Sequence, residues 1–305
     1  PKKYSMKASG IFISENPIDT YSAMNVYQKG VPTCEIDMYI AESIHLEKLD
    51  ILSQRGLGHI KDAVQMVKDN KGIEIDIANT NAFKKDPKCN EMLAKGKTLG
   101  CFYIESPAMR GLLRRLKCDT NETLVAASSI IRPGVAQSGM MREYVERHRD
   151  PSRIKYFHKV FEEQLSDTYG VMVYQEDVIK IAHHFANMGL DEADVLRRGM
   201  SGKSRSKAEI ERIKSLYFEN CKKLGYPDEV TNEVYRQIAS FAGYSFCKSH
   251  SASYAVESYQ SLYLKAYYPL EFITGVINNN GGFYRHEVYI NEARMIVAII
   301  EQPDI

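Results

Sequence analysis

The chain has 305 residues, and its 40 Lys and Arg residues are balanced by 39 Asp and Glu residues, for a formal net charge of +1. This length allows about two domains, each with a core of its own. The charge balance excludes a polycation that adheres to nucleic acid along its whole length. The six cysteines are scattered without a CxxC pair, which argues against disulfides and a structural zinc site and favours a reducing cytosol.

No apolar run approaches the roughly 20 residues that span a bilayer, and no secretory signal pattern is visible. We therefore expect a cytoplasmic protein that makes no membrane contact. The chain begins with Pro1 and stops just after a helical pattern, so we also expect it to be a piece of a longer protein.

The first part of the chain is predicted to be rich in short strands. Residues 11–13 form an apolar strand after a Ser-Gly pair, and residues 26–31 fit a hairpin around a Lys-Gly turn. Segment 44–52 is predicted to be a strand that runs into a core. Lys48 and Asp50 lie on one face of this strand because they are two residues apart.

The rest of the chain is predicted to be mostly helical, with a domain boundary near residue 75, where the composition changes. Apolar residues recur at helical spacing, and prolines and capping residues mark several helix starts. The link at 98–104 is instead predicted to be strand-like. The expected helices cover residues 56–68, 86–95, 107–117, 121–131, 171–188, 206–224, 227–241, 249–268 and 287–300.

The stretch 241–269 combines small polar residues with a long amphipathic helix that ends at a proline. Lys248, Ser249 and His250 stand at the start of this helix. Backbone N–H groups, a hydroxyl, an ammonium and an imidazole in one place suit an anion, most naturally a phosphate. The alternative is that a serine only caps the helix and that Lys248 is solvated. This stretch alone leaves both interpretations open.

A second basic segment, residues 195–207, contains Arg197, Arg198, Lys203 and Arg205. Because the chain as a whole is nearly neutral, this local excess of cations indicates a focused anionic ligand. A Gly-Lys-Ser triplet here is like the end of a P-loop, but Arg197 stands where that motif needs a glycine, and no strand precedes it. We therefore reject a P-loop and expect side-chain donors to bind phosphate instead.

Asp50 is a lone acid in its strand, with Lys48 beside it. The pair is either a structural ion pair or part of a metal site whose other ligands come from elsewhere, because a divalent site needs further carboxylates. Arg110, Arg114 and Arg115 form a basic ridge on the helix at 107–117. They either contact a nucleic-acid backbone or are solvated, and the sequence leaves these two options equal.

Several of these segments resemble, in order, motifs of the C-family bacterial replicative DNA polymerases, the DNA polymerase III alpha subunits. The resemblance extends from about residue 5 to the end of the chain. The matching segments are Lys48-Leu49-Asp50, Ile104-Glu105-Ser106, Arg132-Pro133-Gly134, Tyr174-Gln175-Glu176, Leu196-Arg197-Arg198, Phe241-Ala242-Gly243-Tyr244 and Lys248-Ser249-His250-Ser251. One departure is Lys7, which stands where the family usually has a histidine.

The resemblance implies an α+β fold. Residues 1–75 would be the C-terminal part of a palm related to the β-polymerase nucleotidyltransferases. Residues 76–305 would be a mostly α-helical fingers domain that ends at the start of the next domain. Asp50 would be the third catalytic carboxylate and a ligand of Mg²⁺. The residues implied to bind the triphosphate are Lys48, Arg197, Arg198, Lys203, Arg205, Lys248, Ser249 and His250, and those implied to contact DNA are Arg110, Arg114, Arg115 and Arg132.

The function implied is template-directed DNA synthesis, the transfer of a nucleotide from a dNTP to a primer 3′-OH. The paired palm aspartates of the family are absent, so the two-metal Mg²⁺ site is incomplete and the chain alone is expected to be inactive. The implied partners are primer–template DNA and dNTPs, with the sliding clamp and other replicase subunits bound through parts not in this chain. The alternatives are an error-prone alpha-type polymerase of damage tolerance and a non-catalytic DNA-binding module.

Overall fold

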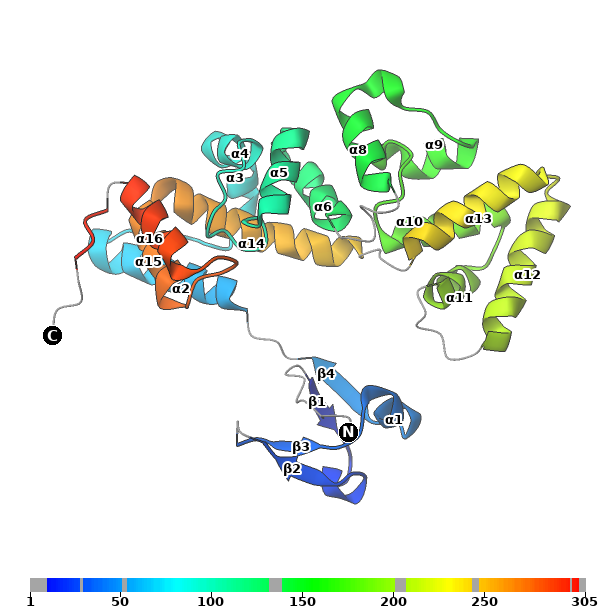
Figure 1. Ribbon diagram of the computed structural model, residues 1–305, viewed down its shortest axis with the longest axis horizontal. Helices are drawn as coiled ribbons and strands as arrows, with labels where there is room; N and C mark the ends of the chain where they lie inside the picture. Colours follow the sequence, from blue (N-terminus) through cyan, green and yellow to red (C-terminus); the bar gives the residue numbers. More distant parts are fainter. Residues whose placement is uncertain are drawn as a thin grey trace. The chain divides into compact units, whose positions relative to one another are not determined.

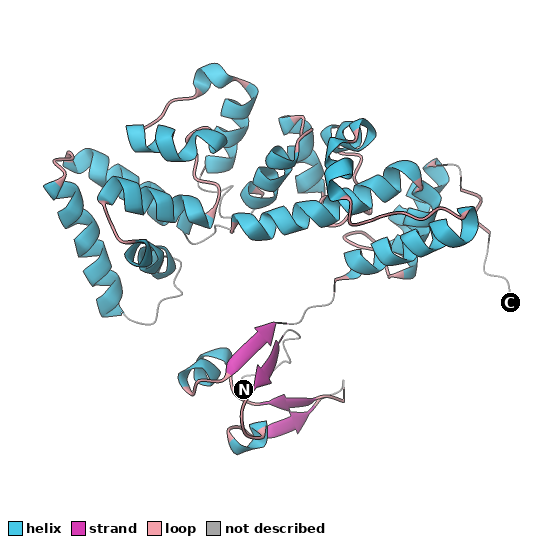
Figure 2. Cartoon of the chain, turned by 180° about the vertical axis from the view of Figure 1, so that it is seen from behind, coloured by secondary structure: helices cyan, strands magenta, loops and turns pink. Residues whose placement is uncertain are grey.

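The structure is a computed structural model that describes residues 10–27, 30–50, 54–131, 139–200, 207–242, 247–296 and 298–301. The chain divides into two compact units, Pro1–Gln54 and Arg55–Ile305 (Figure 1). Among the described residues, strands occur only in the first unit, and the second unit is built from helices (Figure 2). No helix in the described part of the chain is long and apolar enough to cross a membrane.

The first unit contains two small antiparallel sheets and a short helix. Its elements are β1 (Gly10–Ile13), β2 (Met24–Val26), β3 (Pro32–Cys34), α1 (Met38–Ser43) and β4 (Glu47–Asp50). The pairing of β2 with β3 confirms the predicted hairpin, and the pairing of β4 with β1 confirms the predicted strand that carries Lys48 and Asp50. Helix α1 was not predicted, although Asp37 caps it by accepting the N–H of Ile40 at 2.8 Å.

The sequence predicted that strand β4 runs into a core, and this prediction is wrong. Leu49 is 49% exposed, and neighbouring apolar side chains of β1 are exposed as well. Sheets of two strands do not define a nucleotidyltransferase palm, so the palm assignment stays a prediction.

The second unit is arranged around α14, the long orange helix in Figure 1. Helices α2, α3, α4, α6 and α15 all pack against it. The helices are α2 (Arg55–Lys71), α3 (Thr80–Lys85), α4 (Pro87–Ala94), α5 (Pro107–Leu116), α6 (Asn121–Ile130), α8 (Met140–Arg149), α9 (Lys159–Leu165), α10 (Gln175–Ala186), α11 (Leu190–Met200), α12 (Lys207–Lys223), α13 (Asp228–Ala242), α14 (Lys248–Tyr267), α15 (Pro269–Asn278) and α16 (His286–Met295).

The boundary between the two compact units differs from the boundary predicted near residue 75. Helix α2 precedes that residue but packs on α15 and α14, so it belongs to the second unit. The composition of the sequence does not reveal this packing, because it is set by helices about 200 residues further along the chain. The assignment of residues 1–75 to a palm and 76–305 to fingers stays a prediction.

Local capping explains why several predicted helices start where they do. Asp86 accepts the N–H of Cys89 at 2.8 Å at the start of α4, and Ser106 accepts the N–H of Met109 at 3.2 Å at the start of α5. Both helices have a proline in the first turn, where its missing N–H costs nothing. The predictions for α4 and α5 are therefore confirmed.

The prediction for the link at 98–104 is wrong, and the prediction for Pro269 is correct but incomplete. The link at 98–104 is a series of turns and not a strand, with Gly100 and Tyr103 both at positive φ. Pro269 ends α14 as expected, but it also starts α15, which was not predicted. Proline is as suitable at the first position of a helix as it is beyond the last one, so it marks a helix boundary but does not tell a helix end from a new helix start.

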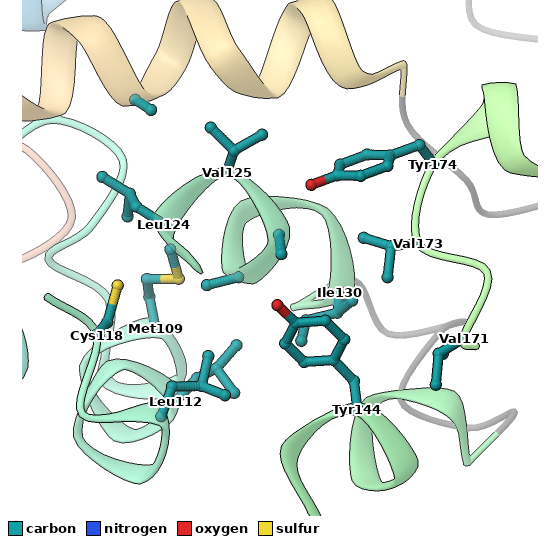
Figure 3. Close-up of a cluster of buried hydrophobic side chains, with 14 of the residues drawn as sticks. Met109, Leu112, Cys118, Leu124, Val125, Ile130, Tyr144, Val171, Val173 and Tyr174 are labelled. Carbon is teal, nitrogen blue, oxygen red and sulfur yellow. The ribbon is translucent and has the colours of Figure 1, made fainter. Parts of the chain in front are cut away.

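A buried core runs through the second unit. Figure 3 shows the part where Leu112 of α5, Val125 of α6 and Tyr144 of α8 meet the extended segment that ends at Tyr174. Tyr144 and Tyr174 are both almost fully buried, and burial raises the pKa of each phenol. This packing holds residues 171–174 in place directly before α10.

Candidate anion-binding site

The start of α14 is capped by a carboxylate from another helix. The N–H of Lys248 donates to both carboxylate oxygens of Glu176, at 3.1 and 3.0 Å. Glu176 lies in the first turn of α10 and is 72 residues away in the sequence. A negative charge at this place is stabilised by the helix dipole and by the unpaired N–H group, typically by about 0.3–1 kcal/mol.

Neither serine caps the helix, which was the alternative that the sequence left open. The Ser249 hydroxyl lies 3.3 Å from the sulfur of Cys247, and the Ser251 hydroxyl bonds that of Ser129 at 2.7 Å. Cys247 precedes the helix and, within the described residues, makes no capping bond. The helix start thus holds an anion, and that anion is the Glu176 carboxylate.

The side chains predicted to bind phosphate at this turn lie on aromatic neighbours. The Lys248 ammonium stands 5.2 Å from the centre of the Tyr174 ring, a favourable cation–π distance. The His250 ring lies 4.1 Å from the ring of Tyr254. Lys248 and Ser249 are exposed, whereas His250 is half-buried. The Tyr174-Gln175-Glu176 motif therefore supports the Lys-Ser-His turn through both its ring and its carboxylate.

Arg197 and Arg198 lie on the last turns of α11, a helix that was not among those expected from the sequence. Arg197 donates from Nε and Nη2 to one oxygen of Asp194 at 2.9 and 2.7 Å, and Arg198 donates to the other oxygen at 2.7 Å. The Arg197 side chain is 13% exposed and that of Arg198 54% exposed. One carboxylate thus orients two guanidinium groups.

A single helix, α10, connects the two basic segments. It packs against α11, which carries the arginine pair, and its Glu176 caps α14. Within the second unit, the sequence-distant segments are thus brought to the same helix (Figure 1). Lys203, Arg205 and Arg132 lie outside the residues whose side chains the structure describes.

The basic ridge on α5 is uneven. Arg110 is half-buried, and its Nε donates to the Gly96 carbonyl oxygen at 2.9 Å, which ties α5 to the loop after α4. Arg114 and Arg115 are exposed on the last turn of the helix. Arg110 therefore has a clear packing role, and the other two present their charge to the solvent.

Asp50 and Lys48 form an ion pair in the first unit, with Nζ and Oδ1 2.6 Å apart. The Asp50 side chain is 61% exposed, so it is accessible to a ligand. No group of three possible metal ligands occurs among the described residues. Mg²⁺ requires near-octahedral oxygen coordination, so the described residues do not form a magnesium site by themselves.

Two acids organise the cations, and the sequence alone assigned neither of them this role, although Glu176 lies in one of the matching motifs. Asp194 lies three and four residues before the arginines, which is the spacing at which side chains pair on a helix, so a helical interpretation of this segment would have found it. Glu176 gave no such signal, because its partner is brought to it only by the fold.

The second unit is therefore a helical domain that carries cationic side chains at two places, the start of α14 and the end of α11. Both places are suited to bind an anion. A family model described as the bacterial DNA polymerase III alpha subunit finger domain matches residues 56–225. The chain therefore belongs to the bacterial DNA polymerase III alpha subunit family, which confirms the resemblance seen in its motifs.

Curated relatives agree with this assignment. The DNA polymerase III subunit alpha of Staphylococcus aureus (strain COL) is 37% identical over 279 residues, which cover 92% of this chain and 26% of that protein. The protein of the same name from Thermus aquaticus is 34% identical over 311 residues, which cover 99% of this chain and 25% of that protein. The chain thus spans about a quarter of the length of the curated relatives it matches.

Proposed function

We propose that this chain is the fingers and the last part of the palm of a DNA polymerase III alpha subunit. Within that subunit it serves template-directed transfer of a nucleotide from a dNTP to the 3′-OH of a primer bound to template DNA. The observation that carries the proposal is the finger-domain match over residues 56–225, which includes the arginine pair and the helix that caps α14. The relatives named DNA polymerase III subunit alpha support the same activity.

In this proposal the second unit binds the triphosphate of the incoming nucleotide. Arg197 and Arg198 donate to phosphate oxygens, and Asp194 orients both guanidinium groups beforehand. Preorganised donors are effective because little has to rearrange as charge develops on the transferring group. On the family resemblance, the other residues of the second unit proposed for the triphosphate are Lys203, Arg205, Lys248, Ser249 and His250. The same resemblance, and no contact in the structure, proposes Lys48 of the first unit.

The proposed role of Asp50 is to supply one carboxylate to a metal site completed by residues outside this chain. A divalent cation bound there would stabilise negative charge on the reacting phosphate. In this proposal Asp50 is the metal ligand contributed by β4, and its ion pair with Lys48 positions the carboxylate. In the same proposal, Arg114 and Arg115 contact the DNA backbone.

The first test replaces Asp50 by Ala in the full-length polymerase that contains this chain. Nucleotide incorporation is expected to fall by about a thousandfold or more, because a charge-stabilising site worth several kcal/mol is lost. Primer–template binding, measured by fluorescence anisotropy, is expected to survive. Glu47→Ala, an exposed acid on the same strand, is the matched control and should leave incorporation unchanged. Full incorporation by the Asp50 variant would remove the metal role.

The second test concerns the arginine pair. Arg197→Ala is expected to raise the KM for dNTP by about 10- to 100-fold, because a charge-assisted hydrogen bond contributes roughly 1.5–3 kcal/mol. Arg212→Ala is a matched control, since Arg212 is paired with Glu209 on α12 at the same spacing, with N and O 2.9 Å apart. Steady-state kinetics of the full-length enzyme measures the KM for dNTP of both variants. Equal KM values for both variants would place Arg197 outside the triphosphate site.

A further inference from the structure

A cavity of about 540 Å³ lies in the second unit among α4, α5, α15, α16 and the end of α14. Its volume is in the range of small-molecule sites. Lys265, which lines it, is 17 positions after the start of α14. At 1.5 Å per residue this is roughly 25 Å along the helix, so the cavity is separate from the candidate anion-binding site.

The lining of this cavity is mostly apolar but carries an excess of positive charge. Leu99 and Ile273 belong to the apolar part, which continues to Met295, a side chain that is 80% exposed. Five cationic side chains and two carboxylates also line the cavity, a formal excess of three positive charges. They are Lys88, Lys95, Lys97, Arg110 and Lys265, with Glu91 and Glu292.

Only two of the five cations are paired with the carboxylates. Lys265 is buried and bonds Glu292 at 2.7 Å and the Leu99 carbonyl oxygen at 2.6 Å. Lys95 pairs with Glu91. Both carboxylates of the cavity are thereby used, and three cations remain.

The three remaining cations form no ion pair with a carboxylate in the part of the chain that the structure describes, although the charge of Lys97 helps to lower the pKa of Glu91. Lys88 donates to the Ala266 carbonyl oxygen and Arg110 to that of Gly96, while Lys97 is exposed. A carbonyl oxygen satisfies a donor but cancels no charge. Lys88 and Lys97 are exposed, so solvent screens much of their repulsion, but Arg110 is half-buried beside the apolar lining, where like charges repel more strongly. A bound anion would relieve this repulsion.

We propose that this cavity binds an amphiphilic anion, with a carboxylate or phosphate-monoester head and a hydrocarbon or aromatic body. The head binds Lys97 and Arg110, and the body lies on Leu99 and Ile273. Nucleic acid does not fit this lining, because a phosphate backbone needs an open track of cations, whereas here they surround an apolar cavity that also contains two carboxylates. The site is independent of the proposed polymerase function.

The test measures binding of dodecanoate and dodecyl phosphate to the 305-residue chain, below their micellar concentrations, by displacement of 8-anilinonaphthalene-1-sulfonate. Saturable 1:1 binding is expected, with affinity rising by roughly threefold to fourfold per added methylene from hexanoate upwards. The two head groups distinguish an acyl carboxylate from a phosphate monoester as the source. Dodecyltrimethylammonium, which has the same body and the opposite charge, is expected not to bind.

Variants locate the site. Lys97→Gln, at an exposed position, is expected to weaken dodecanoate binding by at least about tenfold, and Lys97→Gln with Arg110→Gln to abolish it. Lys61→Gln and Lys180→Gln, exposed cations outside the cavity, are the controls and should bind as the original chain does. Far-UV circular dichroism verifies folding. The proposal is overturned by absent binding, by equal binding of the cationic amphiphile, by tighter binding of dATP at the same place, or by no effect of Lys97→Gln.

Discussion

Replacing Tyr289 by Phe is expected to lower the free energy of unfolding of the second unit by about 2–6 kcal/mol, although the change removes a single oxygen atom. The Tyr289 hydroxyl accepts the N–H groups of Gly282 and Tyr284, both at 3.0 Å, and donates to Glu105 at 2.9 Å. The side chain is fully buried. Without the hydroxyl, the N–H groups of Gly282 and Tyr284 are left without an acceptor, and each such loss costs about 1–3 kcal/mol.

The measurement is urea unfolding followed by far-UV circular dichroism, which reports on the helices of the second unit. The expected change is a lower midpoint at an unchanged slope, because the folded surface stays the same. Tyr284→Phe is the control: its side chain is half-buried, and its hydroxyl has no hydrogen-bond partner among the described residues. Its cost should stay within about 0.5 kcal/mol. If both variants lost the same stability, the buried network would not be the cause.

The same network explains the Ile104-Glu105-Ser106 motif. Glu105 is buried and, besides the Tyr289 hydroxyl, accepts the N–H groups of Gly100 at 2.8 Å and Phe283 at 2.6 Å. Ser106 caps α5. A buried carboxylate is stable when such donors surround it. The motif therefore joins the turn at 98–104 to the segment between α15 and α16, and its role in this structure is architectural.

Gly275→Val is expected to destabilise the second unit by about 2–3 kcal/mol through overpacking. Gly275 lies on α15 where it meets α2, the pair of helices in most extensive contact. A Cβ at this position would stand 2.8 Å from the His59 carbonyl oxygen and 3.4 Å from the Ala63 nitrogen. Both are backbone atoms of α2, so no side chain can rotate away, and the two helices have to separate.

Gly111→Val provides the matched control for this second variant. Gly111 lies inside α5, and apart from its chain neighbours and the nearby backbone of its own helix, no described atom comes within 4 Å of a Cβ built there. Glycine and valine differ by only a few tenths of a kcal/mol in a helix interior, so the unfolding midpoint should hardly move. Thermal unfolding of both variants measures the difference. A stable Gly275 variant would contradict the close contact between α2 and α15.

The sequence by itself determined the features that depend on neighbouring residues. The starts of α4 and α5 follow from Asp86 and Ser106, whose side chains cap N–H groups three residues later. The prediction that Lys48 and Asp50 lie on one face of their strand was likewise correct, since side chains two residues apart share a face. The series of motifs identified the family without any knowledge of the tertiary structure.

Only the tertiary structure decided which anion stands at the start of α14 and which unit contains α2. Glu176 and Lys248 are 72 residues apart, and Tyr289 and Glu105 are 184 residues apart. The formation of such contacts depends on how whole helices pack, which is governed by the burial of many side chains at once and not by any local pattern. Local rules locate helix ends, and packing determines what each end meets.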